Sequence, residues 1–387
     1  MIELSKDQKR VLNTLLDWHK SGCKTQYITV GGYAGTGKTT LISILSKELH
    51  RRNKKLRIAF VSFTGKATQV LKNKILESRA LYPQDRISTI HSLIYSPIEN
   101  SKGVITGWKL KEDVVYDLII IDEASMVDQK IWKDLCSFKV PIIAVGDHGQ
   151  LPPVNGSFNL MEKPTLKLEE IHRQAKDNPI IKLSIMAREE GLVPFGTYSY
   201  SVMKIERRNS ETASFVENLL SEFNPNTLIL CGYNITRVKL NTYIREKLGF
   251  DSPLPLVNDR VICLRNNHEK DIYNGMLGVV KNIEEKTERL FSASLKMDYN
   301  NKLYEGLIYK EQFNNQQSFN FTGERRRFLN GDLFDFGYAL TVHKAQGSQA
   351  KRVILFEERF SKMTDEEWRR WLYTGVTRAE EELFIIG

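Results

Sequence analysis

The chain has 387 residues, 41% of them hydrophobic and 27% charged, so it is long enough to form about two or three domains with sizeable cores. Lys and Arg number 56 against 47 Asp and Glu, a formal charge of +9 that favours a phosphate-rich partner. The four cysteines form no CxxC pair, which argues against a zinc site and a disulfide framework. A polar N-terminus and the lack of an apolar run near the roughly 20 residues of a membrane helix predict a soluble, intracellular protein.

Short apolar runs in the first half of the chain each end in a polar or glycine-rich loop and precede a helical pattern. This alternation predicts a parallel sheet wrapped by helices. The runs are Tyr27–Val30, Ile58–Ser62, Leu118–Ile121 and Ile142–Val145. A β-hairpin is expected over Tyr95–Leu110, with its turn around Asn100–Gly103.

A second series of such runs begins after the Pro and Gly positions near residues 191–196 and predicts a second α/β domain. Its elements are Leu228–Cys231, the helical stretch Ile235–Leu248, and the runs Gly337–Val342, Val353–Phe356 and Leu383–Ile386. Residues 262–334 carry short alternating runs and few helical periods, which is typical of a small inserted β unit. The expected division is a first domain over 1–174, a second over 175–261 and 335–387, and the insertion over 262–334.

The segment from Gly32 to Thr39 reads GYAGTGKT, follows a predicted strand and opens a helix, as the GxxxxGK[ST] phosphate-loop pattern requires. Glycines let backbone N–H groups curl around phosphates, Lys38 reaches the terminal phosphates, and the Thr39 hydroxyl binds magnesium. The pattern predicts a site for ATP and Mg²⁺. The expected nucleotide contacts in the loop are Gly35, Thr36, Gly37, Lys38, Thr39 and Thr40.

An acidic pair, Asp122 and Glu123, follows the predicted strand Leu118–Ile121 at its carboxyl end, where open α/β sheets bind ligands. Asp122 is expected to hold the magnesium ion through water, and Glu123 to polarise the attacking water, because hydrolysis needs a base beside the metal. Kinases, GTPases, transporters and motors share these motifs, so they predict hydrolysis without its purpose.

Three further segments are more specific: DEASM at 122–126, GDHGQLPPV at 146–154 and TVHKAQG at 341–347. Together they resemble superfamily 1B helicases of the RecD and Dda type, and the resemblance covers nearly the whole chain. Other family segments follow in order: LSKDQ at 4–8, FTGKA at 63–67, STIHS at 88–92, Leu168 to HRQ at 172–174, and YTGVTR at 373–378. The resemblance implies two RecA-like P-loop motor domains, with the hairpin 95–110 as an inserted pin and residues 262–334 as a small SH3-like β-barrel.

By position, the resemblance implies that Gln150 senses the γ-phosphate and that Arg173 and Arg378 reach this phosphate. Phosphoryl transfer is catalysed mainly by positive charge around the transferring group, and a planar guanidinium suits that role. A surface ion pair is the alternative for each arginine.

Two other nucleotide contacts are implied, Gln8 at the adenine edge and Gly347. For Gln8 there is an alternative, because Ser5 and Gln8 also form a capping-box pattern at a helix start. Many relatives carry an acidic residue where this chain has Gln349, so a ribose contact there is not expected.

The resemblance also places DNA contacts in both motor domains. They are Thr64, Thr89, His91 and Trp108 in the first, and Thr341, His343 and Lys344 in the second. Contacts with the DNA backbone suit a motor, because contacts that recognise bases would stall it at particular sequences. The alternatives are helix capping by the first two threonines, core packing by His91, and packing of the hairpin by Trp108, which could instead stack on the last base pair. Asn234 and Asn274 are weaker candidates.

The resemblance implies an ATP-dependent DNA helicase that moves 5′ to 3′ on single-stranded DNA and unwinds duplex or forked DNA as the cleft between its motor domains closes and reopens. It further implies a cytoplasmic monomer in a bacterial cell or phage-infected host, with a single-strand-binding or replisome protein as partner. Two alternatives are an ATP-switched nucleic-acid-binding protein that does not travel, and an RNA motor.

Overall fold

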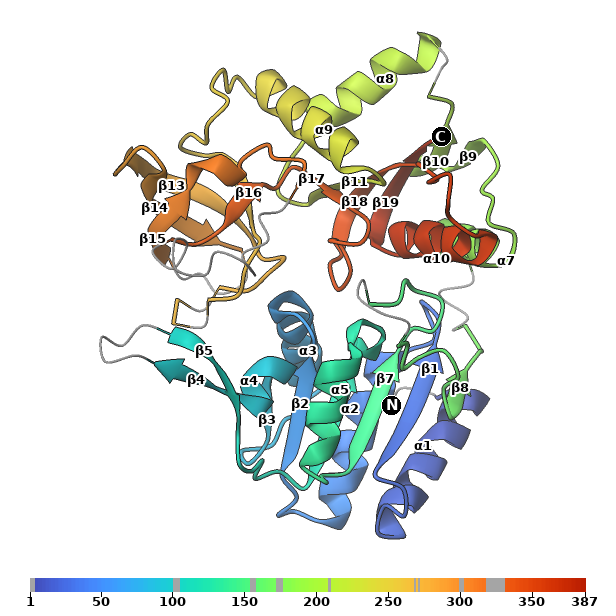
Figure 1. The fold of residues 1–387 in the computed structure, drawn as a ribbon. Helices are drawn as coiled ribbons and strands as arrows, with labels where there is room; N and C mark the ends of the chain where they lie inside the picture. Colours follow the sequence, from blue (N-terminus) through green and yellow to red (C-terminus); the bar gives the residue numbers. More distant parts are fainter. Residues whose placement is uncertain are drawn as a thin grey trace. The chain divides into compact units, whose positions relative to one another are not determined.

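The computed structural model describes residues 4–99, 105–153, 158–171, 177–207, 210–267, 269–270, 272–298, 303–317 and 331–387. The chain divides into two compact units, Met1–Ile181 and Lys182–Gly387 (Figure 1). Within the described ranges, no helix combines the length and the apolar character that crossing a membrane requires.

The described residues of unit 1 form a six-stranded parallel sheet in the order β3-β2-β6-β7-β1-β8. Its strands are β1 (Tyr27–Gly32), β2 (Ile58–Ser62), β3 (Arg86–Thr89), β6 (Leu118–Asp122), β7 (Ile142–Gly146) and β8 (Leu166–Leu168). The helices are α1 (Lys6–Lys20), α2 (Lys38–Arg52), α3 (Gly65–Glu77), α4 (Ile90–Ile94) and α5 (Gln129–Ser137), with a 3₁₀ turn η1 (Ala124–Met126). The four strands expected from the sequence are confirmed.

The sheet of unit 1 is covered on both faces. Phe60 and Ile120 belong to the core that includes α1 and α2, whereas Val61 and Ile121 belong to the core that includes α4 and α5. Successive strand residues point to opposite faces, so a central parallel strand is apolar along its whole length. This burial explains why uninterrupted apolar runs marked the strands.

The hairpin consists of β4 (Tyr95–Glu99) and β5 (Ile105–Leu110), which pair antiparallel and form a separate two-stranded sheet (Figure 1). Tyr95 lies opposite Leu110, and Pro97 lies opposite Trp108. The expected turn lies outside the described residues.

Unit 2 contains, in its described part, a six-stranded sheet in the order β17-β11-β18-β19-β10-β9, parallel except for the edge strand β9. The strands are β9 (Gly196–Ser199), β10 (Val202–Ile205), β11 (Thr227–Cys231), β17 (Ala339–Thr341), β18 (Ala350–Phe356) and β19 (Ala379–Ile386). The helices are α8 (Ser210–Ser221), α9 (Asn234–Lys247) and α10 (Asp365–Val376), and α7 (Pro179–Glu189) begins at the end of unit 1. The predicted second α/β region is confirmed.

The insertion forms a five-stranded antiparallel sheet, counted over described residues, in the order β15-β14-β13-β12-β16. Its strands are β12 (Arg260–Cys263), β13 (Leu277–Glu285), β14 (Leu290–Met297), β15 (Leu303–Tyr309) and β16 (Phe334–Phe336), with a 3₁₀ turn η2 (Lys310–Gln312). Ile308 of the edge strand β15 forms a bridge with Asp332, which lies shortly before the other edge strand, β16. Closure of a barrel requires such a contact between the two edges. The expected ends of the insertion, 262 and 334, fall within β12 and at the start of β16.

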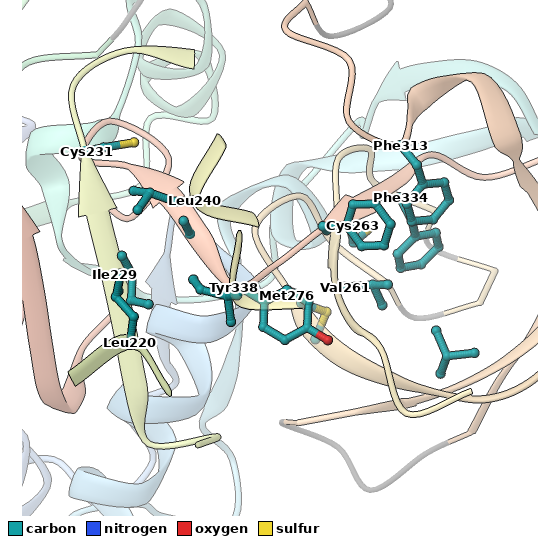
Figure 2. Close-up of a cluster of buried hydrophobic side chains, with 14 of the residues drawn as sticks. Leu220, Ile229, Cys231, Leu240, Val261, Cys263, Met276, Phe313, Phe334 and Tyr338 are labelled. Carbon is teal, nitrogen blue, oxygen red and sulfur yellow. The ribbon is translucent and has the colours of Figure 1, made fainter. Parts of the chain in front are cut away.

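One hydrophobic core joins the inserted sheet to the main sheet of unit 2. Ile229 and Leu240 of the main sheet and its helix α9 share this core with Val261 and Phe334 of the insertion, and Tyr338 lies between the two groups (Figure 2). The insertion therefore packs against the main sheet of unit 2.

Three polar side chains on one face of α9, here called the α9 ladder, reinforce this junction: Arg237, Asn241 and Arg245. The Arg237 Nη1 atom lies 2.7 Å from Asp335 Oδ2, and the Asn241 side-chain oxygen accepts from the backbone N–H groups of Tyr338 and Ala339 at 3.0 and 2.9 Å. Arg245 makes a two-pronged pair with Asp259, both contacts 2.9 Å long. Asp259 precedes β12 and Asp335 lies in β16, so the ladder holds both chain crossings between the two sheets.

Candidate functional site

The phosphate loop runs from the end of β1 into α2. Gly35 and Gly37 take left-handed backbone conformations with φ of 80° and 75°, which glycine adopts without strain. A side chain at Gly32 would place its Cβ 2.6 Å from Thr36 Oγ1. Among the described residues, none caps the N-terminus of α2 with a side chain, so its first backbone N–H groups are suited to a phosphate.

Lys38 is the first residue of α2, and its ammonium group lies over the loop. Its Nζ donates to the carbonyl oxygens of Gly32 and Tyr33 at 2.8 and 3.1 Å, and lies 3.6 Å from Asp147 Oδ2. A phosphate oxygen that Lys38 binds replaces these neutral acceptors with a charged one, which makes a stronger hydrogen bond.

The predicted acidic pair lies at the carboxyl end of β6. Glu123 has a left-handed backbone with φ of 57°, an unusual conformation for a residue with a side chain, and its N–H donates to Asp122 Oδ1 at 3.1 Å. Burial raises the pKa of Asp122 above its ordinary value, the Glu123 carboxylate raises it further, and Lys38 opposes both.

The Oε2 atom of Glu123 is buried without a hydrogen-bond partner among the described residues. An unsatisfied buried carboxylate oxygen beside a second carboxylate fits a hydrated divalent cation, which would supply the missing positive charge and donors. Thr39, in the first turn of α2, and Asp122 are the residues that would hold the ion.

Gln150 lies in a tight turn, residues 147–150, that follows β7. Asp147 is buried at the start of this turn; its Oδ1 accepts from the Gly149 N–H at 2.9 Å, and its Oδ2 lies 3.4 Å from Gln150 Nε2. Since Asp147 also faces Lys38, it connects Gln150 with the phosphate loop. Asp147 was not among the residues predicted from the sequence, although an acidic residue directly after a strand of the same sheet is a detectable signal.

Gln8 is fully buried and makes both halves of the capping box with Ser5, at 3.1 and 3.2 Å. Its side-chain Nε2 also donates to the Thr36 and Gly37 carbonyls of the phosphate loop, at 3.1 and 3.4 Å. The capping-box alternative is confirmed, and the adenine contact stays a prediction. Arg173 lies outside the described residues.

The predicted strand contacts of unit 1 have structural roles of their own. The Thr64 and Thr89 hydroxyls cap α3 and α4, accepting from the N–H groups of Ala67 and Ser92 at 3.1 and 3.2 Å. Helix capping, the alternative considered for both residues, is therefore confirmed. It leaves their contact with a strand a prediction.

His91 and Trp108 pack against each other at the base of the hairpin. Their ring centroids lie 4.6 Å apart at 82°, and His91 also contacts Tyr95 at 4.5 Å. The packing alternative for Trp108 is therefore confirmed. Ile98, on the opposite strand, is 45% exposed and is more accessible than Trp108.

The TVHKAQG segment of unit 2 begins at the carboxyl end of β17. The Lys344 N–H donates to Thr341 Oγ1 at 3.4 Å, and Gly347 has a left-handed φ of 70°. Burial lowers the pKa of His343. Burial also lowers the pKa of Lys344 to about 8, with a further decrease from Arg237.

Arg378 follows α10 and is buried within unit 2. Its guanidinium donates to the Thr374 carbonyl at 3.0 Å, to the Ser348 carbonyl at 3.1 Å and to Thr377 Oγ1 at 3.2 Å. The surface ion pair considered for Arg378 is therefore wrong, because the side chain has too little exposure and bonds to neutral acceptors. Its contact with Ser348 places it beside Gly347, another predicted nucleotide contact.

Comparisons with known proteins match two separate segments of the chain. Residues 19–156 match the AAA domain family, and residues 336–386 match the UvrD-like helicase C-terminal domain family. The chain is 28% identical to the ATP-dependent RecD2 DNA helicase of Deinococcus radiodurans, over 99% of this chain and 49% of that protein. It is 24% identical to the ATP-dependent DNA helicase Pif1 of Campylobacter jejuni, over 84% of this chain and 82% of the relative. The chain thus spans about half the length of the RecD2 relative.

Solved structures of Pif1 helicases share the fold. A structure of Bacteroides Pif1 in complex with ADP-AlF3 and single-stranded DNA matches with a TM-score of 0.55 and 20% identity, covering 100% of this chain and 93% of the other. A structure of Pif1 helicases at forked double-stranded DNA matches with a TM-score of 0.56 and 18% identity, covering 100% and 92%. Together with the motif geometry of both units, the two family matches and the RecD2 and Pif1 relatives point to a superfamily 1B helicase of the RecD, Pif1 and Dda type.

Proposed function

We propose that this chain is an ATP-dependent DNA helicase that moves 5′ to 3′ along single-stranded DNA and unwinds duplex DNA. The observation that carries the proposal is the clustering in unit 1 of Lys38, Asp147 and Gln150 at the carboxyl ends of β1 and β7, with Asp122 and Glu123 on the next strand. The names of the RecD2, Pif1 and dda relatives support the same activity. The resemblance to the 1B branch supports the polarity.

In hydrolysis, Lys38 would bind the terminal phosphates and Glu123 would accept a proton from the attacking water, since its unpartnered oxygen is a ready acceptor. Thr39 and Asp122 would hold Mg²⁺, which neutralises phosphate charge when bound. Gln150 would contact the γ-phosphate, and Arg173 and Arg378 would add positive charge to it.

To move along DNA, the protein must bind the strand through residues of each motor domain. Thr64, Thr89 and His91 would provide these contacts in unit 1, and Thr341, His343 and Lys344 in unit 2. We further propose that the hairpin separates the strands, that the inserted sheet closes as an SH3-like barrel, and that the chain acts as a monomer. The bacterial and phage relatives support action on cytoplasmic DNA of a bacterial cell or phage-infected host. We also propose a single-strand-binding or replisome protein as partner.

An unwinding assay on duplexes with a 5′ or a 3′ single-stranded tail tests the proposal. ATP should drive strand separation only from the 5′ tail. Lys38→Ala should abolish this separation while retaining DNA binding, because it removes only the positive charge that would bind the ATP phosphates.

Displacement of streptavidin from single-stranded ends distinguishes a motor from a static switch. A chain that hydrolyses ATP with DNA but displaces nothing and unwinds neither substrate would be an ATP-switched binding protein. Stronger stimulation of hydrolysis by RNA than by DNA would contradict the DNA assignment.

A further inference from the structure

The phosphate loop carries an aromatic ring, that of Tyr33, to which the hydrolytic assignments give no role. The ring lies against the imidazole of His148, with centroids 4.1 Å apart and planes tilted by 43°. Tyr33 directly follows β1, and His148 lies in the turn that follows β7, the neighbouring parallel strand. The Tyr33–His148 ring pair therefore joins the phosphate loop to the turn that carries Gln150.

The imidazole of His148 also fits closely against β1. A Cβ added at Gly31 would lie 2.9 Å from His148 Nδ1. Only a residue without a side chain leaves this space, so the imidazole contacts both the backbone of β1 and the Tyr33 ring. Its position is thus set by the elements that carry the phosphate loop.

The ring of Tyr33 is separable from the part that shapes the loop. The Tyr33 carbonyl oxygen accepts from Thr36 N, Thr36 Oγ1 and Lys38 Nζ, at 3.3, 2.8 and 3.1 Å. Any residue at this position supplies a carbonyl, so these contacts do not require an aromatic side chain. A substitution that removes the ring should leave the loop hydrogen bonds in place.

Two of the links between the loop and the turn respond differently to a nucleotide. The first runs from Lys38 to Asp147 at 3.6 Å, and from Asp147 to Gln150. This link weakens when Lys38 binds a phosphate, because the ammonium then has a new anionic partner. The ring pair does not involve Lys38, so it persists when the first link changes.

We propose that the Tyr33–His148 ring pair holds the turn of residues 147–150 in register with the phosphate loop, which makes Tyr33 a positioning residue for ATP hydrolysis. This inference rests on the proposed function, because Gln150 serves catalysis only in a chain that hydrolyses ATP. The Tyr33 ring acts through the turn and Gln150, and not on the nucleotide itself. Removal of the Tyr33 ring should therefore lower kcat, since a misplaced Gln150 loses transition-state contacts while Lys38 still binds ATP.

Steady-state ATP hydrolysis with saturating single-stranded DNA tests the proposal on Tyr33→Ala, Tyr33→Phe, His148→Ala and the Tyr33→Ala/His148→Ala double variant. An aromatic pair contributes enough for a roughly two- to tenfold fall in kcat in each alanine variant. The KM for ATP should stay within about twofold, as expected for an effect confined to the transition state. The double variant should be no slower than either single one, and Tyr33→Phe should restore most of kcat because it keeps the ring.

The same unit offers a matched control. Tyr82 stacks on His50 with ring centroids 3.9 Å apart, outside the loops that form the site. Tyr82→Ala removes a similar ring pair and should lower thermal stability without changing kcat at temperatures where the chain is folded.

A second readout does not depend on hydrolysis. Amide hydrogen exchange at Gly149 and Gln150, whose N–H groups donate to Asp147 in the turn, should be faster in Tyr33→Ala than in Tyr33→Phe. Equal exchange in both would overturn the proposal, as would additive losses in the double variant or a raised KM at unchanged kcat. A wild-type chain without DNA-stimulated hydrolysis contradicts the proposed function instead, while the exchange comparison still decides whether the ring pair orders the turn.

Discussion

The ammonium group of Lys344 lies in largely buried surroundings after β17, within the electrostatic reach of Arg237 and Asp335. Burial and Arg237 lower its pKa to about 8, and Asp335 partly opposes them. A strand phosphate beside Lys344 would favour the charged form and raise this pKa again. Strand binding and protonation of Lys344 should therefore be linked.

We expect the affinity for single-stranded DNA to fall roughly fivefold between pH 7 and pH 9 at constant ionic strength. Below pH 8 Lys344 is mostly charged before DNA binds, so the affinity for DNA is at its highest. Above pH 8 Lys344 must take up a proton when DNA binds, so the affinity falls as the pH rises towards the pKa of Lys344 in the complex. His343 does not contribute, because its lowered pKa keeps it neutral over this range.

Fluorescence anisotropy with a labelled oligonucleotide measures this dependence, with Lys344→Arg as control. A guanidinium does not titrate below pH 12, so the variant should show a flat profile. An equally steep profile in Lys344→Arg would assign the titration to another group.

Several residue roles depend on burial that a sequence pattern does not encode. The Ser5 and Gln8 spacing predicted the capping box because both partners lie in one helical turn, whereas the bonds from Gln8 to the phosphate loop cross from α1 to α2. Arg378 could be placed near the nucleotide by its motif, but its bond to the Ser348 carbonyl depends on how α10 packs.

At the scale of elements, the hairpin has a packed base and carries an exposed apolar side chain, Ile98, in β4. The base is held by the ring contact of His91 with Trp108 and by the Tyr95 hydroxyl, which donates to Asp134. The Lys111 ammonium, at the end of β5, donates to the carbonyls of Ser92 and Leu93, both at 2.8 Å. A wedge at a fork needs such a base, because the outer part would otherwise bend away from the duplex.

Replacement of residues 99–106 by a short Gly-Ser turn should abolish unwinding while DNA-stimulated ATP hydrolysis and streptavidin displacement stay within about twofold of wild type, since the site residues in both units are untouched. Retention of Trp108 and His91 keeps the base packed. Gel-based strand separation on a fork and the two single-strand assays measure these outcomes.

The matched variant is Trp108→Ala, which removes the base contact and leaves the outer hairpin. It should lower the free energy of unfolding by about 1–3 kcal/mol. This loss is smaller than the loss from truncating a fully buried tryptophan, because Trp108 is only half-buried. Normal unwinding by the Gly-Ser variant would contradict the wedge role.

In unit 1 the sequence predicted the four central strands and missed the edge strands β3 and β8. In unit 2 it predicted the edge strand β17 and missed β9 and β10. Central strands such as β6 are buried on both faces and must be apolar throughout. The edge strand β9 is exposed over half its length, and β8 has three residues of mixed burial, so neither produces an apolar run. The α9 ladder was equally invisible, because its partners lie far away along the chain.

On the scale of the whole molecule, unit 2 contains two sheets with one core. Arg245 and Asp259 are both almost fully buried, so the removal of one partner leaves an uncompensated charge in the interior. The pair links α9 to the first strand of the insertion, and the shared core continues through Val261 into the main sheet. The two sheets should therefore unfold together.

Arg245→Met should lower the free energy of unfolding by about 3–5 kcal/mol. The free energy of opening measured at amides in β11 and at amides in β13 should fall by this same amount. Native-state hydrogen exchange measures both strands in one experiment. Lys351→Met, which breaks the exposed pair with Glu381, is the control and should change neither. Faster exchange confined to β13 would show that the insertion unfolds separately.

The shared core also decides how this protein can be recombined with its relatives. A chimera that swaps residues 262–334 would cut β12 internally, separate Val261 from its native neighbour Phe334, and join foreign residues directly to Asp335, which pairs with Arg237 of the α9 ladder. An exchange from Asn234 to Thr341 carries α9, both chain crossings and the insertion together. The smallest graft that preserves its own contacts is thus larger than the insertion itself, and it ends at Thr341, where the TVHKAQG segment begins.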